Sequence, residues 1–237
     1  MKRIKLIAYF VFIILFAASA GYAREPFQAS ANFSLGFPQN EFRNNVDQIG
    51  YSGVGHFAYS FRNSPFLAGI SLGILVYGSE RREEPFGPTI PDVMVDVVTR
   101  NNIFLCHFLF RVQPPRGTLR PYLDGLIGFN YLFTDTSVKS QRFDEDNPIA
   151  SSNMYNDMAF SYGAGGGMMV QVLTKQRASG KGSFVMYIDM AVRYLKGGRA
   201  EYLKEGSIRI EGDQVLYDVN RSTTDLVTGY IGVSFSF

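Results

Sequence analysis

Apolar and polar residues alternate with a period of two in eight segments, each about ten residues long, beyond residue 24. The first segment, Phe27 to Phe37, places Phe, Ala and Leu on one face and Gln, Ser, Asn and Gly on the other. Because successive side chains of a strand point to opposite sides, this period predicts β-strands with one apolar face. The eight segments are 27–37, 51–62, 66–77, 103–111, 120–133, 158–172, 184–194 and 227–237.

The polar face of these segments is built mostly from Ser, Gly, Ala, Asn and Tyr. A sheet with its polar face in water normally exposes Lys, Glu and Asp there. Small residues instead suit the inside of a narrow eight-stranded barrel, and segments of about ten residues match tilted strands that cross a bilayer. We therefore predict an all-β fold, an eight-stranded antiparallel up-and-down transmembrane β-barrel. A soluble exported barrel that buries its apolar face around a small apolar ligand is the alternative.

The connections between the segments alternate between long and short. They run over 38–49, 63–65, 78–92, 113–118, 134–156, 174–182 and 197–224. Short turns on one side and long loops on the other are typical of outer-membrane barrels, and this pattern places both termini in the periplasm. Within the longest connection, Ser207 to Val219 predicts a hairpin, and Val93, Val95 and Val97 are expected to extend the fourth strand.

The composition excludes several classes of protein. The chain is 46% hydrophobic and 19% charged, against roughly 25% charged in an average soluble domain. Lys and Arg total 23 and Asp and Glu total 21, so the near neutral balance argues against a nucleic-acid partner. One cysteine, Cys106, excludes a disulfide framework and a cysteine metal cluster, and only two histidines are present. We therefore expect no cofactor.

The N-terminus has the pattern of a secretory signal peptide. Lys2, Arg3 and Lys5 precede an apolar run from Leu6 to Ala18, and small residues follow up to Ala23. The run is shorter than the roughly 18 apolar residues of a spanning helix. We predict that residues 1–23 are removed and that 24–237 form one barrel domain.

The last strand carries a family resemblance. Ile231, Val233, Phe235 and the final Phe237 alternate along one face. This resembles the C-terminal strand signature of bacterial outer-membrane barrels, and the resemblance implies that the barrel-assembly machinery reads it. The mature chain is similar to the small eight-stranded group that includes OmpA-type transmembrane domains and OmpX-like proteins. The resemblance implies an outer-membrane location and contact with outer-membrane lipid. Basic residues of the long loops are candidates either for charge-assisted hydrogen bonds to lipopolysaccharide phosphates or for ordinary solvated loop charge; they are Arg81, Arg82, Lys139, Arg142, Arg199 and Lys204.

Two sets of residues are candidates for roles within such a barrel. Six ionisable side chains on the lumen face are expected to neutralise one another, because an unpaired buried charge is costly; they are His107, Arg111, Arg120, Asp124, Asp189 and Arg193. Since the chain has no tryptophan, tyrosine and phenylalanine must form any interfacial belt. The candidates are Tyr51, Phe61, Tyr131, Phe133, Tyr162, Tyr194, Phe235 and Phe237.

Catalysis is not predicted. A lipid A-modifying barrel enzyme would need a serine activated by an adjacent histidine. His56 lies four residues from both Ser52 and Ser60, which separates the pairs by roughly 13 Å along a strand. We therefore expect a non-enzymatic protein with a structural or surface-interaction role through its long outer loops. A lipid A-modifying outer-membrane enzyme stays as a second alternative.

Overall fold

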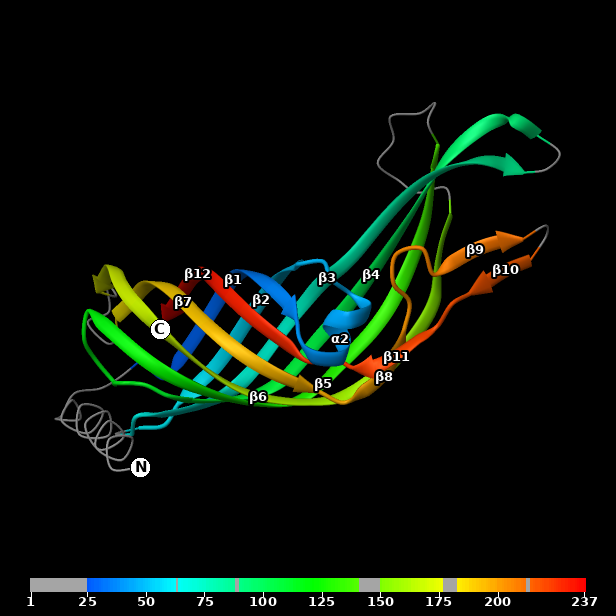
Figure 1. Cartoon of the computed structure of the whole chain (residues 1–237). Coiled ribbons are helices and arrows are strands. Elements are labelled where there is room, and N and C mark those ends of the chain that lie inside the picture. Colours follow the sequence, from blue (N-terminus) through cyan, green and yellow to red (C-terminus); the bar gives the residue numbers. More distant parts are fainter. Residues whose placement is uncertain (1–24, 63, 88–89, 141–149, 177–182, 212–213) are drawn as a thin grey trace.

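The computed structural model describes residues 25–62, 64–87, 90–140, 150–176, 183–211 and 214–237, and its main feature is a closed barrel (Figure 1). Eight antiparallel strands form the wall in the order β1-β12-β7-β6-β5-β4-β3-β2. They are β1 (Phe27–Pro38), β2 (Gly50–Ser60), β3 (Phe66–Gly87), β4 (Ile90–Val112), β5 (Leu119–Ser140), β6 (Ala150–Gln176), β7 (Ser183–Gly197) and β12 (Leu226–Ser236). The predicted eight-stranded up-and-down barrel is confirmed.

The first and last strands close the barrel. β1 and β12 pair from Gln28↔Ser236 to Pro38↔Leu226, and the backbones of Phe27 and Phe237 exchange two hydrogen bonds of 3.0 and 3.1 Å. We call the end of the barrel where β1 begins and β12 ends the terminal end, and the opposite end the loop end. The predicted signal peptide, residues 1–23, lies outside the described residues.

Side chains point to the two sides of the wall as the alternation predicts. Phe33 and Phe108 are 56% and 64% exposed on the outside, whereas Ser161 and Ser234 are fully buried inside. The outward positions of 66–76, 104–112, 119–133, 158–170 and 184–194 carry no charged residue. Since a wall of this composition would be unstable in water, it faces the acyl chains of a bilayer.

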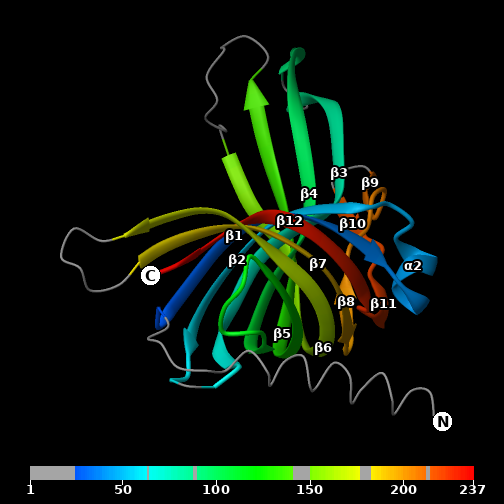
Figure 2. The ribbon, with the colours of Figure 1, turned by 90° about the vertical axis from the view of Figure 1, so that its left-hand side faces the viewer.

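Strands β3 to β6 are much longer than predicted. β2 pairs with β3 only as far as Tyr51↔Val76, and β6 pairs with β7 only as far as Ser161↔Gly197. Beyond these points β3, β4, β5 and β6 leave the closed wall as a four-stranded sheet, which we call the extension and which rises from one side of the barrel (Figures 1 and 2). The prediction of loops over 78–92 and 134–156 was therefore wrong for most of their length. The expected extension of the fourth strand is confirmed, because β4 begins at Ile90.

Short elements close the mouth at the loop end. The connection after β1 contains the helix α2 (Asn40–Asn45), and the connection before β12 contains β8 (Arg199–Tyr202), β9 (Ile208–Glu211), β10 (Gln214–Tyr217) and β11 (Asn220–Thr223). β9 and β10 form the predicted hairpin. Phe42 of α2 is fully buried, with its ring centroid 5.6 Å from that of Tyr77 and 5.2 Å from that of Tyr202. Within the described ranges, no helix combines the length and hydropathy that a membrane-crossing helix requires.

Candidate functional site

A buried ionic cluster lies in the barrel interior and joins three strands. Arg111 of β4 donates to Asp124 of β5 from Nε (2.7 Å to Oδ1) and Nη2 (3.0 Å to Oδ2). Arg193 of β7 donates to Oδ2 of Asp124 from Nη2 (2.5 Å) and Nε (3.1 Å). The side chain of Asp124 is fully buried. Both carboxylate oxygens are therefore occupied by charge-assisted hydrogen bonds.

Two glycines of β6 make room for this cluster. Gly165 lies in register between Asp124 and Arg193, and a Cβ placed there would be 2.4 Å from Cγ of Arg193. A Cβ on Gly167 would be 2.5 Å from Cζ and Oη of Tyr122. The glycine-rich segment of β6 therefore lets Arg193 reach across one strand to Asp124.

Two tyrosines connect the cluster to a second carboxylate. The hydroxyl of Tyr122 donates to Oδ1 of Asp189 (2.5 Å) and lies 2.7 Å from the hydroxyl of Tyr230. The hydroxyl of Tyr230 accepts from Arg193 (3.1 Å) and Arg111 (3.4 Å). The guanidinium of Arg111 also stacks 3.6 Å from the centroid of the Tyr122 ring. Two arginines and two aspartates thus share one buried network.

All six predicted lumen charges are buried inside the barrel, but the network includes only four of them. Arg120 donates instead to the carbonyl of Gly117 (3.3 Å), and its guanidinium lies 4.6 Å from the ring centroid of Tyr187. His107 has no hydrogen-bond partner at Nε2 within the described residues. Sequence reasoning missed the two bridging tyrosines, although their even positions on the lumen face of β5 and β12 were a visible signal.

The interior is filled on both sides of this network. Towards the terminal end, Gln28 accepts from Gln113 (3.1 Å) and donates to Ser234 (2.9 Å) and to the sulfur of Met169 (3.0 Å). Towards the loop end the lumen holds a buried apolar group, which we call the apolar cap. Its members are Phe42, Leu75, Tyr77, Ile103, Leu132, Leu195, Tyr202 and Leu226, and they belong to a larger buried cluster that also includes Leu105, Leu109 and Leu126.

The predicted interfacial aromatics all lie on the outer wall. Tyr51, Phe61, Tyr162, Tyr194 and Phe237 are exposed, and Tyr131, Phe133 and Phe235 are half-buried. By their positions along the strands, Phe61, Phe235 and Phe237 lie near the terminal end and the others lie towards the loop end.

The residues of the expected assembly signal sit in a fully paired strand. Ile231 and Val233 lie in β12 between β1 and β7. The ring of Phe235 stacks on that of Phe184 with centroids 5.4 Å apart, and Phe237 bonds to Phe27. In the folded protein this segment is therefore part of the barrel seam.

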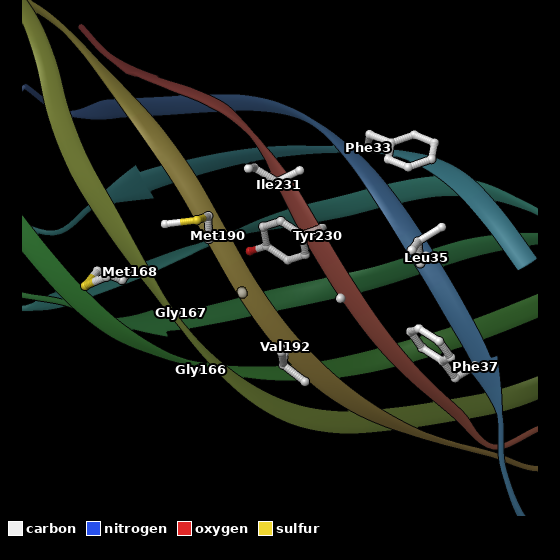
Figure 3. Close-up of a pocket in the computed structure, with 12 residues that line it drawn as sticks. Phe33, Leu35, Phe37, Gly166, Gly167, Met168, Met190, Val192, Tyr230 and Ile231 are labelled. Carbon is white, nitrogen blue, oxygen red and sulfur yellow. The ribbon is translucent and has the colours of Figure 1, made fainter. Parts of the chain in front are cut away.

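A broad depression of about 690 Å³ lies in the outer wall across β1, β12, β7 and β6 (Figure 3). Gly166 and Gly229 contribute no side chain to it, while Phe33, Met190 and Ile231 form part of its rim. The depression is lined almost wholly by apolar residues and opens to the same side as the rest of the wall. It is a hollow in the lipid-facing surface, with no polar group arranged for chemistry.

Within the described residues, His56 forms no hydrogen bond with Ser52 or Ser60. His56, Ser52 and Ser60 are all buried on the lumen side, and neither ring nitrogen of His56 has a hydrogen-bond partner within the described residues. In the same part of the chain, no group of three or more His, Cys, Asp or Glu side chains could hold a metal ion.

The sequence matches no protein-family model and no curated protein. Among solved structures, the chain is similar to Neisserial surface protein A, with 12% identity over 91% of this chain and 100% of that one and a TM-score of 0.41. It is also similar to the transport unit of the autotransporter AIDA-I from Escherichia coli, with 8% identity over 94% and 96% of the two chains and a TM-score of 0.29. The barrel described above rests on its own strand order and register.

Proposed function

We propose that the protein is a non-enzymatic, integral protein of the bacterial outer membrane that holds the extension outside the cell for a surface partner. The apolar outer wall supports the membrane location, and the loop alternation favours periplasmic termini. The filled lumen favours a scaffold over an open pore. The single observation that carries the surface role is the extension itself.

The base of the extension is braced on the β3 side. Glu205, in the loop between β8 and β9, accepts from the backbone N–H of Ser79 (2.9 Å). Glu80 accepts from the N–H of Gly206 (3.0 Å), and Arg82 donates to the carbonyl of Ile208 (2.9 Å). These bonds tie the first residues of the extension to the loops over the mouth.

The β6 side is braced in the same way by β8. The hydroxyl of Tyr155 donates to Glu201 (2.6 Å), and Asp157 accepts from the N–H of Glu201 (2.7 Å). Because both edges are fixed at the base, we expect the extension to keep one orientation relative to the barrel.

Farther out, the two edges offer backbone hydrogen-bonding groups. Within the described residues, no strand other than β4 pairs with the outer part of β3, and no strand other than β5 pairs with the outer part of β6. Unpaired edges of this kind accept an extended segment of another protein as an additional strand. We therefore propose that recognition takes place at the extension, with the β9–β10 hairpin beside it as a second surface.

The proposal includes three further contacts. The outer wall would contact outer-membrane lipid, and Arg81 and Arg199, which are 69% and 67% exposed at the loop end, would meet lipopolysaccharide phosphates. The strand that ends in Phe237 would be read by the barrel-assembly machinery before the seam closes.

Mass spectrometry of lipid A from cells with and without the protein tests the absence of catalysis, since a changed acyl pattern would contradict it.

Shortening the extension tests its role as a surface. In the first variant, a two-residue Asn-Gly turn replaces residues 83–96. This turn joins Arg82 of β3 to Val97 of β4, which lie opposite each other in the paired strands. We expect cells that carry this variant to lose adhesion to host cells or matrix that the full chain supports. A second variant lacks 207–219, the β9–β10 hairpin and its flanks.

The control for both variants is a gel comparison of boiled and unboiled samples, which reports whether the closed barrel has formed. If both shortened proteins assemble and adhere as well as the full chain, the proposed surface role is wrong.

A further inference from the structure

A small polar pocket lies at the loop end, where β3 leaves the closed wall. Its volume is about 200 Å³, and its lining comes from the end of α2 with the connection that follows it, from β3, and from the loop between β8 and β9. Asp47 and Gln48 are exposed, so the pocket opens to water. The lining residues are Asn45, Val46, Asp47, Gln48, Tyr77, Lys204 and Glu205.

Hydrogen bonds hold the walls of this pocket together. Nε2 of Gln48 donates to Oε2 of Glu205 (2.6 Å), and Oε1 of the same carboxylate accepts from the backbone N–H of Ser79 (2.9 Å). The hydroxyl of Tyr77 donates to the carbonyl of Leu203 (2.9 Å). These bonds fix the three segments to one another, so the pocket is formed before a ligand binds, as ligand sites usually are.

Two charged side chains of the lining take no part in holding the walls. Within the described residues, neither the ammonium of Lys204 nor the carboxylate of Asp47 forms a hydrogen bond or an ion pair, although both line the same pocket. Lys204 is half-buried, and a charge withdrawn from water is normally paired. The pocket therefore presents one cation and one anion that a ligand can match.

The lining decides which class of ligand fits. A metal ion would lie beside the ammonium of Lys204, and an inorganic anion would lie beside the carboxylates of Asp47 and Glu205, so each would be repelled. A molecule with one group of each sign satisfies Lys204 and Asp47 together, through charge-assisted hydrogen bonds.

The size of the pocket limits the ligand further. Its volume of about 200 Å³ is below the roughly 300–1,000 Å³ of pockets that hold drug-sized ligands. Both charged groups of the ligand must therefore lie close together on a small molecule. Val46 and Tyr77 offer apolar contact for a short side chain.

We propose that this pocket binds a small zwitterion, a free α-amino acid, with its carboxylate on Nζ of Lys204 and its ammonium between Asp47 and Glu205. The site is separate from the unpaired edges of the extension and does not depend on the surface partner proposed above.

Binding of L-alanine to the folded full-length protein tests the proposal. The protein is kept in micelles of an uncharged detergent, so that no headgroup competes, and the backbone amide resonances of Asp47 and Lys204 are followed by NMR. We expect saturable shifts with a Kd in the millimolar range. Acetate and methylammonium, which each carry only one of the two charges, should bind more weakly by about tenfold or more.

Lys204→Met and Asp47→Asn each remove one charge of the pocket, and each should raise the Kd for L-alanine by about tenfold or more. The matched controls are Lys196→Met and Asp218→Asn, at exposed positions that do not line the pocket, and they should leave the Kd unchanged. A gel comparison of boiled and unboiled samples shows that each variant has formed the barrel.

Absence of saturable shifts in the wild-type protein would overturn the proposal, whether or not the variants fold. Wild-type affinity in folded Lys204→Met and Asp47→Asn would overturn it as well. The same holds if acetate binds as tightly as L-alanine, or if Ca²⁺ shifts these resonances and L-alanine does not.

Discussion

Removing the charge of Asp124 is expected to destabilise the barrel more than any other single change in its interior. The fully buried carboxylate accepts four hydrogen bonds, two from each of Arg111 and Arg193. In Asp124→Asn, the amide oxygen can serve one guanidinium, but the amide nitrogen faces the other. One buried arginine then lacks its counter-ion, which costs about 3–5 kcal/mol of unfolding free energy.

Urea unfolding of the refolded protein from lipid vesicles, followed by circular dichroism and by gel mobility of unboiled samples, measures this loss. Glu83→Gln, at an exposed position on the extension, is the control and should change stability by less than about 0.5 kcal/mol. The triple variant Arg111→Met, Asp124→Leu, Arg193→Met should recover most of the loss, because apolar residues replace buried ion networks at little cost. A change below about 1 kcal/mol in Asp124→Asn would refute the reasoning.

Two further predictions concern the interior packing and the base of the extension. Gly167→Ala should lower the unfolding free energy by about 1–3 kcal/mol in the same assay, because the new methyl group meets the phenol of Tyr122. The control is Gly229→Ala, which has open space at its Cβ and should have little effect. The hydrogen bond from Arg82, followed by that from the loop between β8 and β9, holds the pKa of Glu80 below its ordinary value of 4.5. This contribution is present above that pH and is lost as the pH falls through the lowered pKa. The protection of the loop amides against hydrogen exchange, corrected for the intrinsic exchange rate at each pH, should therefore fall in acid, and Glu80→Gln should remove that pH dependence.

The sequence predicted the barrel wall well because the wall has two chemically different sides. Each strand of the wall has one face towards lipid and one towards the lumen. The alternation of Phe33, Leu35 and Phe37 with small polar residues therefore indicates which side chains of β1 point outward. The β9–β10 hairpin was predictable for a similar reason, since apolar residues flank a short turn.

Apart from the extension of β4, which Val93, Val95 and Val97 indicated, the extension could not be predicted in the same way. Its strands leave the closed wall, so their two faces do not differ as a lipid face and a lumen face do. The charged run from Glu80 to Glu83 is typical of a solvated loop. What forms the strands is pairing across the sheet. Arg81 donates to Asp96 at 2.6 Å, and the hydroxyls of Thr99 and Thr136 lie 3.2 Å apart.

The sequence predicted which charged residues lie in the lumen, but not which of them bond to one another. Alternation places Arg111, Asp124 and Arg193 in the lumen, but the register between strands determines which of them meet. Arg193 reaches Asp124 across an intervening strand only because Gly165 stands between them. No periodicity in the sequence reports that contact.

The most direct test of the account is whether the outward face contacts acyl chains. Since the chain has no tryptophan, Phe108→Trp on the outer wall and Leu216→Trp on β10 each give a single fluorescent reporter at an exposed position. In vesicles whose lipids carry bromine along the acyl chains, we predict strong quenching at position 108 and little at position 216. Quenching at position 108 by aqueous iodide, with none by the brominated lipids, would contradict the account.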